Sequence, residues 1–201
     1  EVLDPHLVKI AIMEELNYFN EKVWQIPSKE SMFDVKDHVF VRSRWVLCNK
    51  GDVDEPDMRA RLVACEVNKG QKDWNCYAST PPLESKKFLF SEYATEQRRM
   101  DSNGKWQPLR LSFIDIKKAY FNAIPKRAVF MRLPAEMGLP KNIVARQTRC
   151  VYGTRDAGML WEETYRLALE QCGFVTGAVN PCMFHHPNWN IQVVVRGDDF
   201  T

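Results

Sequence analysis

The sequence lacks the marks of membrane, secreted and zinc-binding proteins. No apolar run comes close to the roughly 20 residues that a membrane-spanning helix needs, and the acidic, amphipathic N-terminus is unlike a signal peptide. The six cysteines are widely spaced and form no C-x-x-C pair, which argues against a disulfide scaffold and a zinc ribbon. No repeat or low-complexity tract occurs. We therefore expect a soluble, intracellular protein, and its 201 residues allow one large domain or two small ones.

Cys182, His185 and His186 form the only cluster in the sequence that resembles a set of zinc ligands. No second pair of ligands lies at the spacing of a zinc finger. We therefore interpret the three as a strand-borne cysteine beside surface histidines.

The net charge of +2 says little about nucleic acid, but its distribution along the chain says more. Residues 1–58 hold seven Lys or Arg against twelve Asp or Glu, and residues 101–150 hold ten against three. A basic block of this kind suits a surface that binds phosphate chains, and an ordinary solvated face is the alternative.

Hydrophobic periodicity and turn residues predict helices and strands in irregular alternation. A helix begins at Asp4-Pro5 and runs to about Asn20, because Asp is a good N-cap and Pro fits the first helical position. An apolar stripe predicts the clearest helix, over residues 155–172. The other expected elements are a helix at 85–97, a short helix after Asp115 through Asn122, strands at 39–47, 61–64, 109–114 and 128–133, and a hairpin of 183–185 with 192–195. Helices mixed with hairpins indicate an α+β domain.

Three aspartates follow two of these strands. Gly197-Asp198-Asp199 comes after the apolar run 191–195, and Asp115 comes after the run 109–114. Strand ends that bring three carboxylates to one spot suit two divalent metal ions, because Mg²⁺ prefers oxygen ligands. A Gly-Asp-Asp alone is a weak signal, and its pairing with Asp115 strengthens it.

Six blocks, in the same order, resemble the reverse transcriptase of copia-type retrotransposons. Residues 113–122 (FIDIKKAYFN) are similar to the first palm motif of that family. Residues 151–158 (VYGTRDAG) with Trp161 are similar to its Leu-Tyr-Gly-Leu-Lys-Gln-Ala-Pro…Trp block. The remaining blocks are 20–24 (NEKVW), 44–46 (RWV), 59–64 (RARLVA), and 173–174 with 180–184 (GF and NPCMF). Together they cover nearly the whole chain.

The resemblance implies a fingers and palm fold. The fingers are then about 1–110 and 126–150, and the palm is about 111–125 and 151–201, with an antiparallel sheet backed by helices. The implied activity is that of an RNA-directed DNA polymerase, which transfers nucleotides from dNTPs to a primer 3′-hydroxyl. Two Mg²⁺ ions, with Mn²⁺ as a substitute, are the implied cofactors.

The resemblance also assigns roles to single residues. Asp115 and Asp198 are then the bridging metal ligands, Asp199 is a weaker ligand, and the backbone carbonyl of Ile116 adds an oxygen. The implied nucleotide contacts are Arg59 and Arg61 on the triphosphate, Tyr120 beneath the sugar as a steric gate, and Asp156 beside the nucleotide. A solvated hairpin and a core tyrosine are the plain alternatives for the two arginines and for Tyr120.

The implied partners are an RNA or DNA template with its primer, dNTPs, and the integrase and RNase H domains of a Pol polyprotein, with no membrane. The implied location is a cytoplasmic virus-like particle or the nucleus. Because the sequence stops two residues after Asp199, we expect a truncated piece without thumb or RNase H. We also expect it to stop before the second strand of the catalytic hairpin.

Three positions depart from the family pattern. Arg196 stands where the family has the aromatic residue of Tyr-x-Asp-Asp, and Gly158 replaces a proline. Asp156 replaces a glutamine, and a carboxylate beside a triphosphate is unfavourable unless Arg155 or a metal offsets its charge. Two alternatives therefore stay open. One is an inactive retroelement relic that at most binds nucleic acid, and the other is an unrelated metal-dependent phosphoryl transferase that needs no template.

Overall fold

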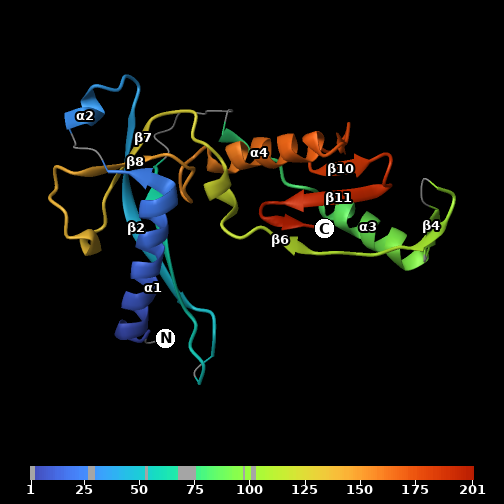
Figure 1. Ribbon diagram of the computed structural model, residues 1–201, viewed down its shortest axis with the longest axis horizontal. Helices are drawn as coiled ribbons and strands as arrows, with labels where there is room; N and C mark the ends of the chain where they lie inside the picture. The colour runs from blue at the N-terminus through green and yellow to red at the C-terminus, as the bar shows by residue number, and fades with distance from the viewer. Residues whose placement is uncertain (1–2, 27–29, 53, 68–75, 97, 101–102) are drawn as a thin grey trace. The chain divides into compact units, whose positions relative to one another are not determined.

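The computed structural model describes residues 3–26, 30–52, 54–67, 76–96, 98–100 and 103–201 (Figure 1). The fold is α+β, which confirms the predicted class. The chain forms two compact units, and α4 (Ala157–Gln171) begins in the first and ends in the second. Unit 1 comprises Glu1–Trp74 and Tyr120–Leu160, and unit 2 comprises Asn75–Ala119 and Trp161–Thr201.

Unit 1 is built on a five-stranded sheet in the order β1-β8-β7-β2-β3. β2 and β7 are parallel, and the other neighbours are antiparallel. The predicted hairpin of β2 with β3 is confirmed, with Trp45 opposite Leu62 in its register. The strands are β1 (Trp24–Gln25), β2 (Val39–Asn49), β3 (Met58–Cys65), β7 (Val129–Arg132) and β8 (Val144–Gln147). In addition to the start of α4, the helical segments are α1 (Pro5–Tyr18), a π-turn (Phe19–Val23), α2 (Glu30–Phe33), and the 3₁₀ turns η3 (Ala119–Asn122) and η4 (Ala135–Met137).

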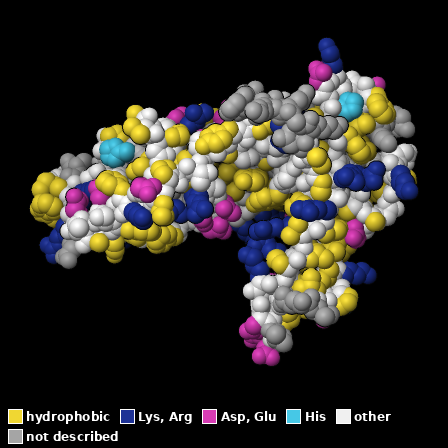
Figure 2. Space-filling view, turned by 180° about the vertical axis from the view of Figure 1, so that it is seen from behind, with side chains coloured by type: hydrophobic (Ala, Val, Ile, Leu, Met, Phe, Trp, Pro, Cys, Tyr) yellow, Lys and Arg dark blue, Asp and Glu magenta, His cyan; other side chains and the backbone are white. Residues whose placement is uncertain are grey.

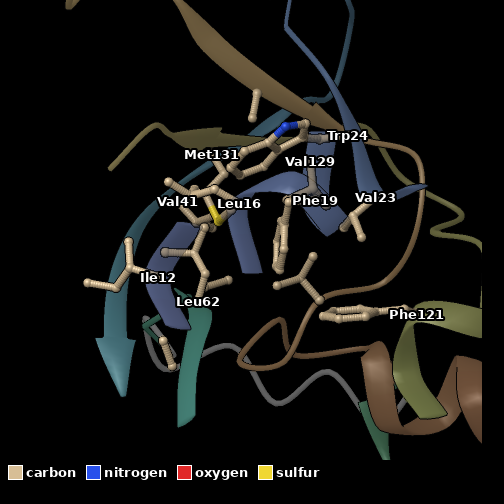
Figure 3. Close-up of a cluster of buried hydrophobic side chains, with 14 of the residues drawn as sticks. Ile12, Leu16, Phe19, Val23, Trp24, Val41, Leu62, Phe121, Val129 and Met131 are labelled. Atoms are coloured by element: carbon tan, nitrogen blue, oxygen red, sulfur yellow. The ribbon is translucent and has the colours of Figure 1, made fainter. Parts of the chain in front are cut away.

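α1 covers one face of this sheet. Its start is the predicted one, because the Asp4 carboxylate accepts a hydrogen bond from the backbone N–H of His6 at 2.7 Å and Pro5 opens the helix. Ile12 and Leu16 point from α1 into the core (Figure 3). The strands contribute alternate residues to it, among them Val41, Leu62, Val129 and Met131. Burial of this apolar surface is what holds α1 to the sheet.

Unit 2 contains a second five-stranded sheet, in the order β6-β12-β11-β10-β9, and all its pairings are antiparallel. Tyr165 of α4 lies against this sheet, with its ring centroid 6.1 Å from that of Phe184 and 5.7 Å from that of Phe200. The strands are β6 (Ile114–Asp115), β9 (Val175–Thr176), β10 (Met183–His186), β11 (Ile191–Arg196) and β12 (Asp199–Phe200). The unit also contains α3 (Leu83–Thr95) and a small ribbon of β4 (Arg98–Met100) with β5 (Trp106–Pro108). Residues 75–110, expected in the fingers, lie in unit 2, and residues 120–125 and 151–160, expected in the palm, lie in unit 1, so the two units do not coincide with the expected division.

The predicted strand over 109–114 is wrong except at its end. Only Ile114 and Asp115 are in a strand, and residues 109–113 have no regular structure. A strand needs a hydrogen-bonded neighbour, and β12, the neighbour of β6, pairs over just two residues. The chain was also expected to stop before the second strand of the catalytic hairpin. That expectation is wrong, because β12 follows the Gly-Asp-Asp turn and pairs with β11, with Asp199 opposite Arg196.

No helix in the part of the chain that the structure describes is long and apolar enough to cross a membrane.

Candidate metal centre and arginine face

The structure brings Asp115, Asp198 and Asp199 together at one edge of the unit 2 sheet. Asp115 ends β6 and lies directly opposite Asp199 on β12, and Asp198 lies in the turn before it. One carboxylate oxygen of each residue lies within 4.8 Å of the others, and all three side chains are exposed. Among the described residues, no other group of three or more acidic, His or Cys side chains is placed to hold a metal ion. The predicted juxtaposition of the three aspartates is therefore present.

The conformation of one glycine and two hydrogen bonds hold the turn in place. Gly197 adopts a φ of +63°, in the left-handed region that glycine enters freely. The indole N–H of Trp161, on α4, donates a hydrogen bond to the Gly197 carbonyl at 2.7 Å. On the other side, the backbone N–H of Ile116 donates to the carbonyl of Asp198 at 2.9 Å. Asp198 is thus tied to the strand that carries Asp115, and α4 supports the turn.

The electrostatics of this arrangement are unfavourable without a counter-ion. Like charges directly opposite each other on antiparallel strands are destabilising, and Asp115 faces Asp199 in this way. A divalent cation removes the penalty. The donor atoms are all oxygens and the site is open to water, which fits Mg²⁺ because that ion usually keeps several waters alongside one or two carboxylates.

Unit 1 carries a face rich in arginine on the side of its sheet opposite α1. Arg42 and Arg44 point outward from β2, and Arg59 and Arg61 of β3 share that face, because Arg61 is opposite Val46 in the register. Figure 2 shows Lys and Arg side chains gathered on one part of unit 1. We call this surface the arginine face, and its members are Arg42, Arg44, Arg59, Arg61, Arg132 and Arg146. Within the described residues, none of the six forms a salt bridge, so their charges are available to an anionic ligand.

Tyr120 lies in η3 and is half-buried, while its neighbour Phe121 takes the core position. The Tyr120 ring packs against Tyr152, with centroids 4.6 Å apart and planes 34° apart. The guanidinium carbon of Arg61 lies 5.8 Å from the centroid of that same Tyr152 ring. Two of the residues predicted to contact the nucleotide, Tyr120 and Arg61, therefore meet on one aromatic ring.

Asp156 is buried, and both its carboxylate oxygens accept hydrogen bonds from Arg127 at 2.8 Å. The same guanidinium donates to both oxygens of Glu66 at 2.6 Å, and the backbone N–H of Arg155 donates to Glu66 at 2.9 Å. We call Glu66, Arg127 and Asp156 the clamp. Arg127 thus supplies the charge that offsets Asp156, whereas Arg155 or a metal was expected to do so. The contact of Asp156 with a nucleotide stays a prediction.

Ionisation in the clamp follows from its hydrogen bonds. Burial alone raises the pKa of the Glu66 carboxyl, but hydrogen bonds from Arg127 and Arg155 outweigh it and leave that pKa below its ordinary value. The hydrogen bonds that Arg127 donates to Glu66 and Asp156 raise the pKa of Arg127 further above its usual range. Glu66 and Arg127 are therefore both charged at neutral pH.

The cluster of Cys182, His185 and His186 is not gathered around a common point. Cys182 is fully buried, and burial raises the pKa of its thiol to about 11. His186 stacks on Trp189 with ring centroids 4.1 Å apart and lies 3.1 Å from the Cys172 carbonyl. His185 is exposed on β10, as expected, but His186 is buried and Cys182 lies in the turn before β10. The interpretation as a strand-borne cysteine beside surface histidines is therefore wrong for Cys182 and His186.

No protein-family model matches this chain, and no solved structure matches it.

Sequence reasoning missed the residues that support the predicted ones. Glu66 and Arg127 lie far apart in the sequence, and no local pattern pairs them. Tyr152 and Trp161 lie within the blocks of resemblance, but nothing in the sequence indicated their contacts with Tyr120 and Gly197.

Proposed function

We propose that this chain is the fingers and palm part of a copia-type reverse transcriptase. In this proposal it copies RNA into DNA by adding dNTPs to a primer 3′-hydroxyl, and unit 2 contains the palm. The observation that carries the proposal is the meeting of Asp115 with Asp198 and Asp199, from strands far apart in the sequence, within 4.8 Å. The blocks of resemblance support the assignment because they place these same three residues in the catalytic motifs.

The donor set favours nucleotidyl transfer over chemistry that needs a histidine or cysteine ligand. Three carboxylates and nearby backbone carbonyls, such as that of Ile116, are hard oxygen ligands of the kind that Mg²⁺ and Mn²⁺ accept. Asp115 and Asp198 would hold both ions, with Asp199 as a weaker ligand. When bound, the ions lower the pKa of the primer hydroxyl and stabilise negative charge on the leaving pyrophosphate.

The chain's own residues would bind and orient the reactants. The primer 3′-oxygen attacks the α-phosphate of the dNTP, its proton passes to solvent, and pyrophosphate leaves. Arg59 and Arg61 would bind the triphosphate, because a guanidinium offers paired donors that match phosphate oxygens. Tyr120, whose ring is half-buried and held against Tyr152, would lie beneath the sugar and exclude a 2′-hydroxyl.

The test is primer extension on an RNA template with Mg²⁺ or Mn²⁺, using the chain within the full reading frame that encodes it. We expect incorporation of dNTPs by the wild-type protein and its loss, by at least about 100-fold, in Asp198→Asn. Asp34→Asn is the matched control, because it removes the same charge at an exposed position far from the triad in the sequence. Incorporation that survives Asp198→Asn would contradict the proposal, and a folded wild-type protein that binds template but adds no nucleotide would favour the inactive relic.

A further inference from the structure

The Tyr152 ring is the shared contact of two residues that the proposed function assigns to the nucleotide. Tyr120 packs against it at 4.6 Å between centroids, and the Arg61 guanidinium carbon lies 5.8 Å from its centroid. All three residues belong to unit 1. The orientation of Tyr120 and that of Arg61 therefore both depend on one side chain.

The backbone around Tyr152 is fixed to β3. The backbone N–H of Ala64 donates to the Tyr152 carbonyl at 2.7 Å. Gly153 comes so close to the Ala64 carbonyl that an added Cβ would lie 2.0 Å from that oxygen, and its φ is +88°. Only glycine fits there, so the chain after Tyr152 has little freedom to move away from β3.

The clamp holds segment 152–156 at its C-terminal end. Glu66, just beyond β3, accepts the backbone N–H of Arg155, and Arg127 joins Glu66 to Asp156. Segment 152–156 is therefore attached to β3 at Tyr152 and again at Arg155 and Asp156. Phe121 packs edge-on against the Tyr152 ring at 5.5 Å, which limits rotation of that ring.

We propose that Tyr152 is a positioning residue for the incoming nucleotide, holding Tyr120 at the sugar and Arg61 at the triphosphate. This inference rests on the proposed function. Tyr152 itself transfers no proton and holds no metal. It acts by restricting the two side chains that do contact the nucleotide, so its loss weakens both nucleotide binding and sugar discrimination.

The test compares Tyr152→Leu with Tyr152→Phe in single-nucleotide primer extension with dNTPs and rNTPs. Two aromatic pairs, with Tyr120 and with Phe121, and one cation–π contact are lost in the leucine variant, so we expect KM for dNTP to rise about 3- to 10-fold. The preference for dNTP over rNTP falls by a similar factor, and the affinity for primer–template stays unchanged. Tyr152→Phe keeps the ring and stays within about 2-fold of wild type in both quantities.

Tyr18→Leu is the matched control for a purely structural effect. Tyr18 packs on Phe121 at 5.6 Å in the same aromatic group, so its loss lowers the stability of unit 1. It leaves the preference for dNTP over rNTP unchanged, because the fraction of folded enzyme cancels in that ratio. If Tyr152→Leu does not fold, Tyr152→His takes its place, since a smaller ring gives a smaller change in the same direction.

A folded Tyr152→Leu or Tyr152→His variant with an unchanged dNTP preference, or with a loss in kcat alone, would overturn the inference and leave the proposed function standing. Absence of incorporation by the wild-type protein would instead overturn the proposed function, and this inference with it.

Discussion

Asp115 and Asp199 lie directly opposite each other on the antiparallel strands β6 and β12, as a like-charge pair. With Asp198 they bring three carboxylate oxygens within 4.8 Å in a solvent-exposed site. Repulsion within such a pair lowers the stability of the fold when no cation is bound, and the same negative charge attracts a cation. The loss of stability and the metal affinity of the site therefore have the same origin.

Replacing one member of the pair therefore separates stability from metal binding. We expect Asp199→Asn to raise the free energy of unfolding by about 0.2–1 kcal/mol in metal-free buffer, because the repulsion across the strands is relieved. The same variant gains less stability than wild type when Mg²⁺ or Mn²⁺ is added. Thermal unfolding with and without metal measures both effects, and a metal-free variant less stable than wild type would show that Asp115 and Asp199 do not repel each other.

The turn that carries Asp198 depends on Trp161. Trp161→Phe keeps the apolar ring but removes the hydrogen bond to the Gly197 carbonyl, so we expect a loss of about 1 kcal/mol in unfolding free energy. Because that bond also fixes the position of Asp198, nucleotide incorporation falls more than the folded fraction does. Denaturant unfolding and primer extension on the same preparations test this. A variant that loses stability but keeps full activity per folded molecule would show that the bond does not position Asp198.

Two glycines with positive φ differ in their surroundings. The added methyl of Gly197→Ala meets open space, so the variant loses only about 1–2 kcal/mol of unfolding free energy, from the strain of the left-handed backbone. Gly153→Ala has the same backbone strain and also forces a Cβ against the Ala64 carbonyl, so we expect a further loss of about 1–3 kcal/mol of unfolding free energy. Unfolding free energies measured by denaturant titration compare the two, and equal losses would contradict the close approach of Gly153 to β3.

The clamp makes stability depend on pH in the acid range. The folded pKa of Glu66 is below its unfolded value, so its contribution is fully present above the ordinary value of 4.5 and is lost as pH falls through the folded pKa. Glu66→Gln removes this dependence, and we expect its unfolding free energy to fall less steeply than that of wild type below about pH 5. Unfolding titrations from pH 7 to pH 3 measure the slopes, with Glu14→Gln, at an exposed position of α1, as the control. Equal slopes in wild type and Glu66→Gln would show that Arg127 does not stabilise the ionised carboxylate.

Much of the fold could be predicted from local signals. The Asp4-Pro5 start of α1, the apolar stripe of α4 and the hairpins of β2 with β3 and of β10 with β11 all follow from capping and periodicity. The error over residues 109–113 has a non-local cause. Their apolar run satisfied the strand pattern, but a strand also requires a hydrogen-bonded neighbour, and the pattern contains no information about one.

The candidate site divides in the same way. Asp115, Asp198 and Asp199 were found because strand ends and the order of the blocks are visible in the sequence. The clamp could not be predicted in this way, because its members come from three distant segments and meet only in the folded unit: Glu66, Arg127 and Asp156. Asp156 shows this most clearly: the sequence marked it as a carboxylate that Arg155 or a metal had to offset, and its Arg127 partner was not predicted.

The most direct test of the central claim is whether the template dictates which nucleotide is added. The full reading frame would be given an oligo(dT) primer on poly(rA) with Mg²⁺ or Mn²⁺, and dTTP or dGTP in separate reactions. We predict incorporation of dTTP, little of dGTP, and neither in Asp198→Asn. Incorporation of both nucleotides alike, or without any template, would contradict a reverse transcriptase and favour a phosphoryl transferase that uses the same three aspartates.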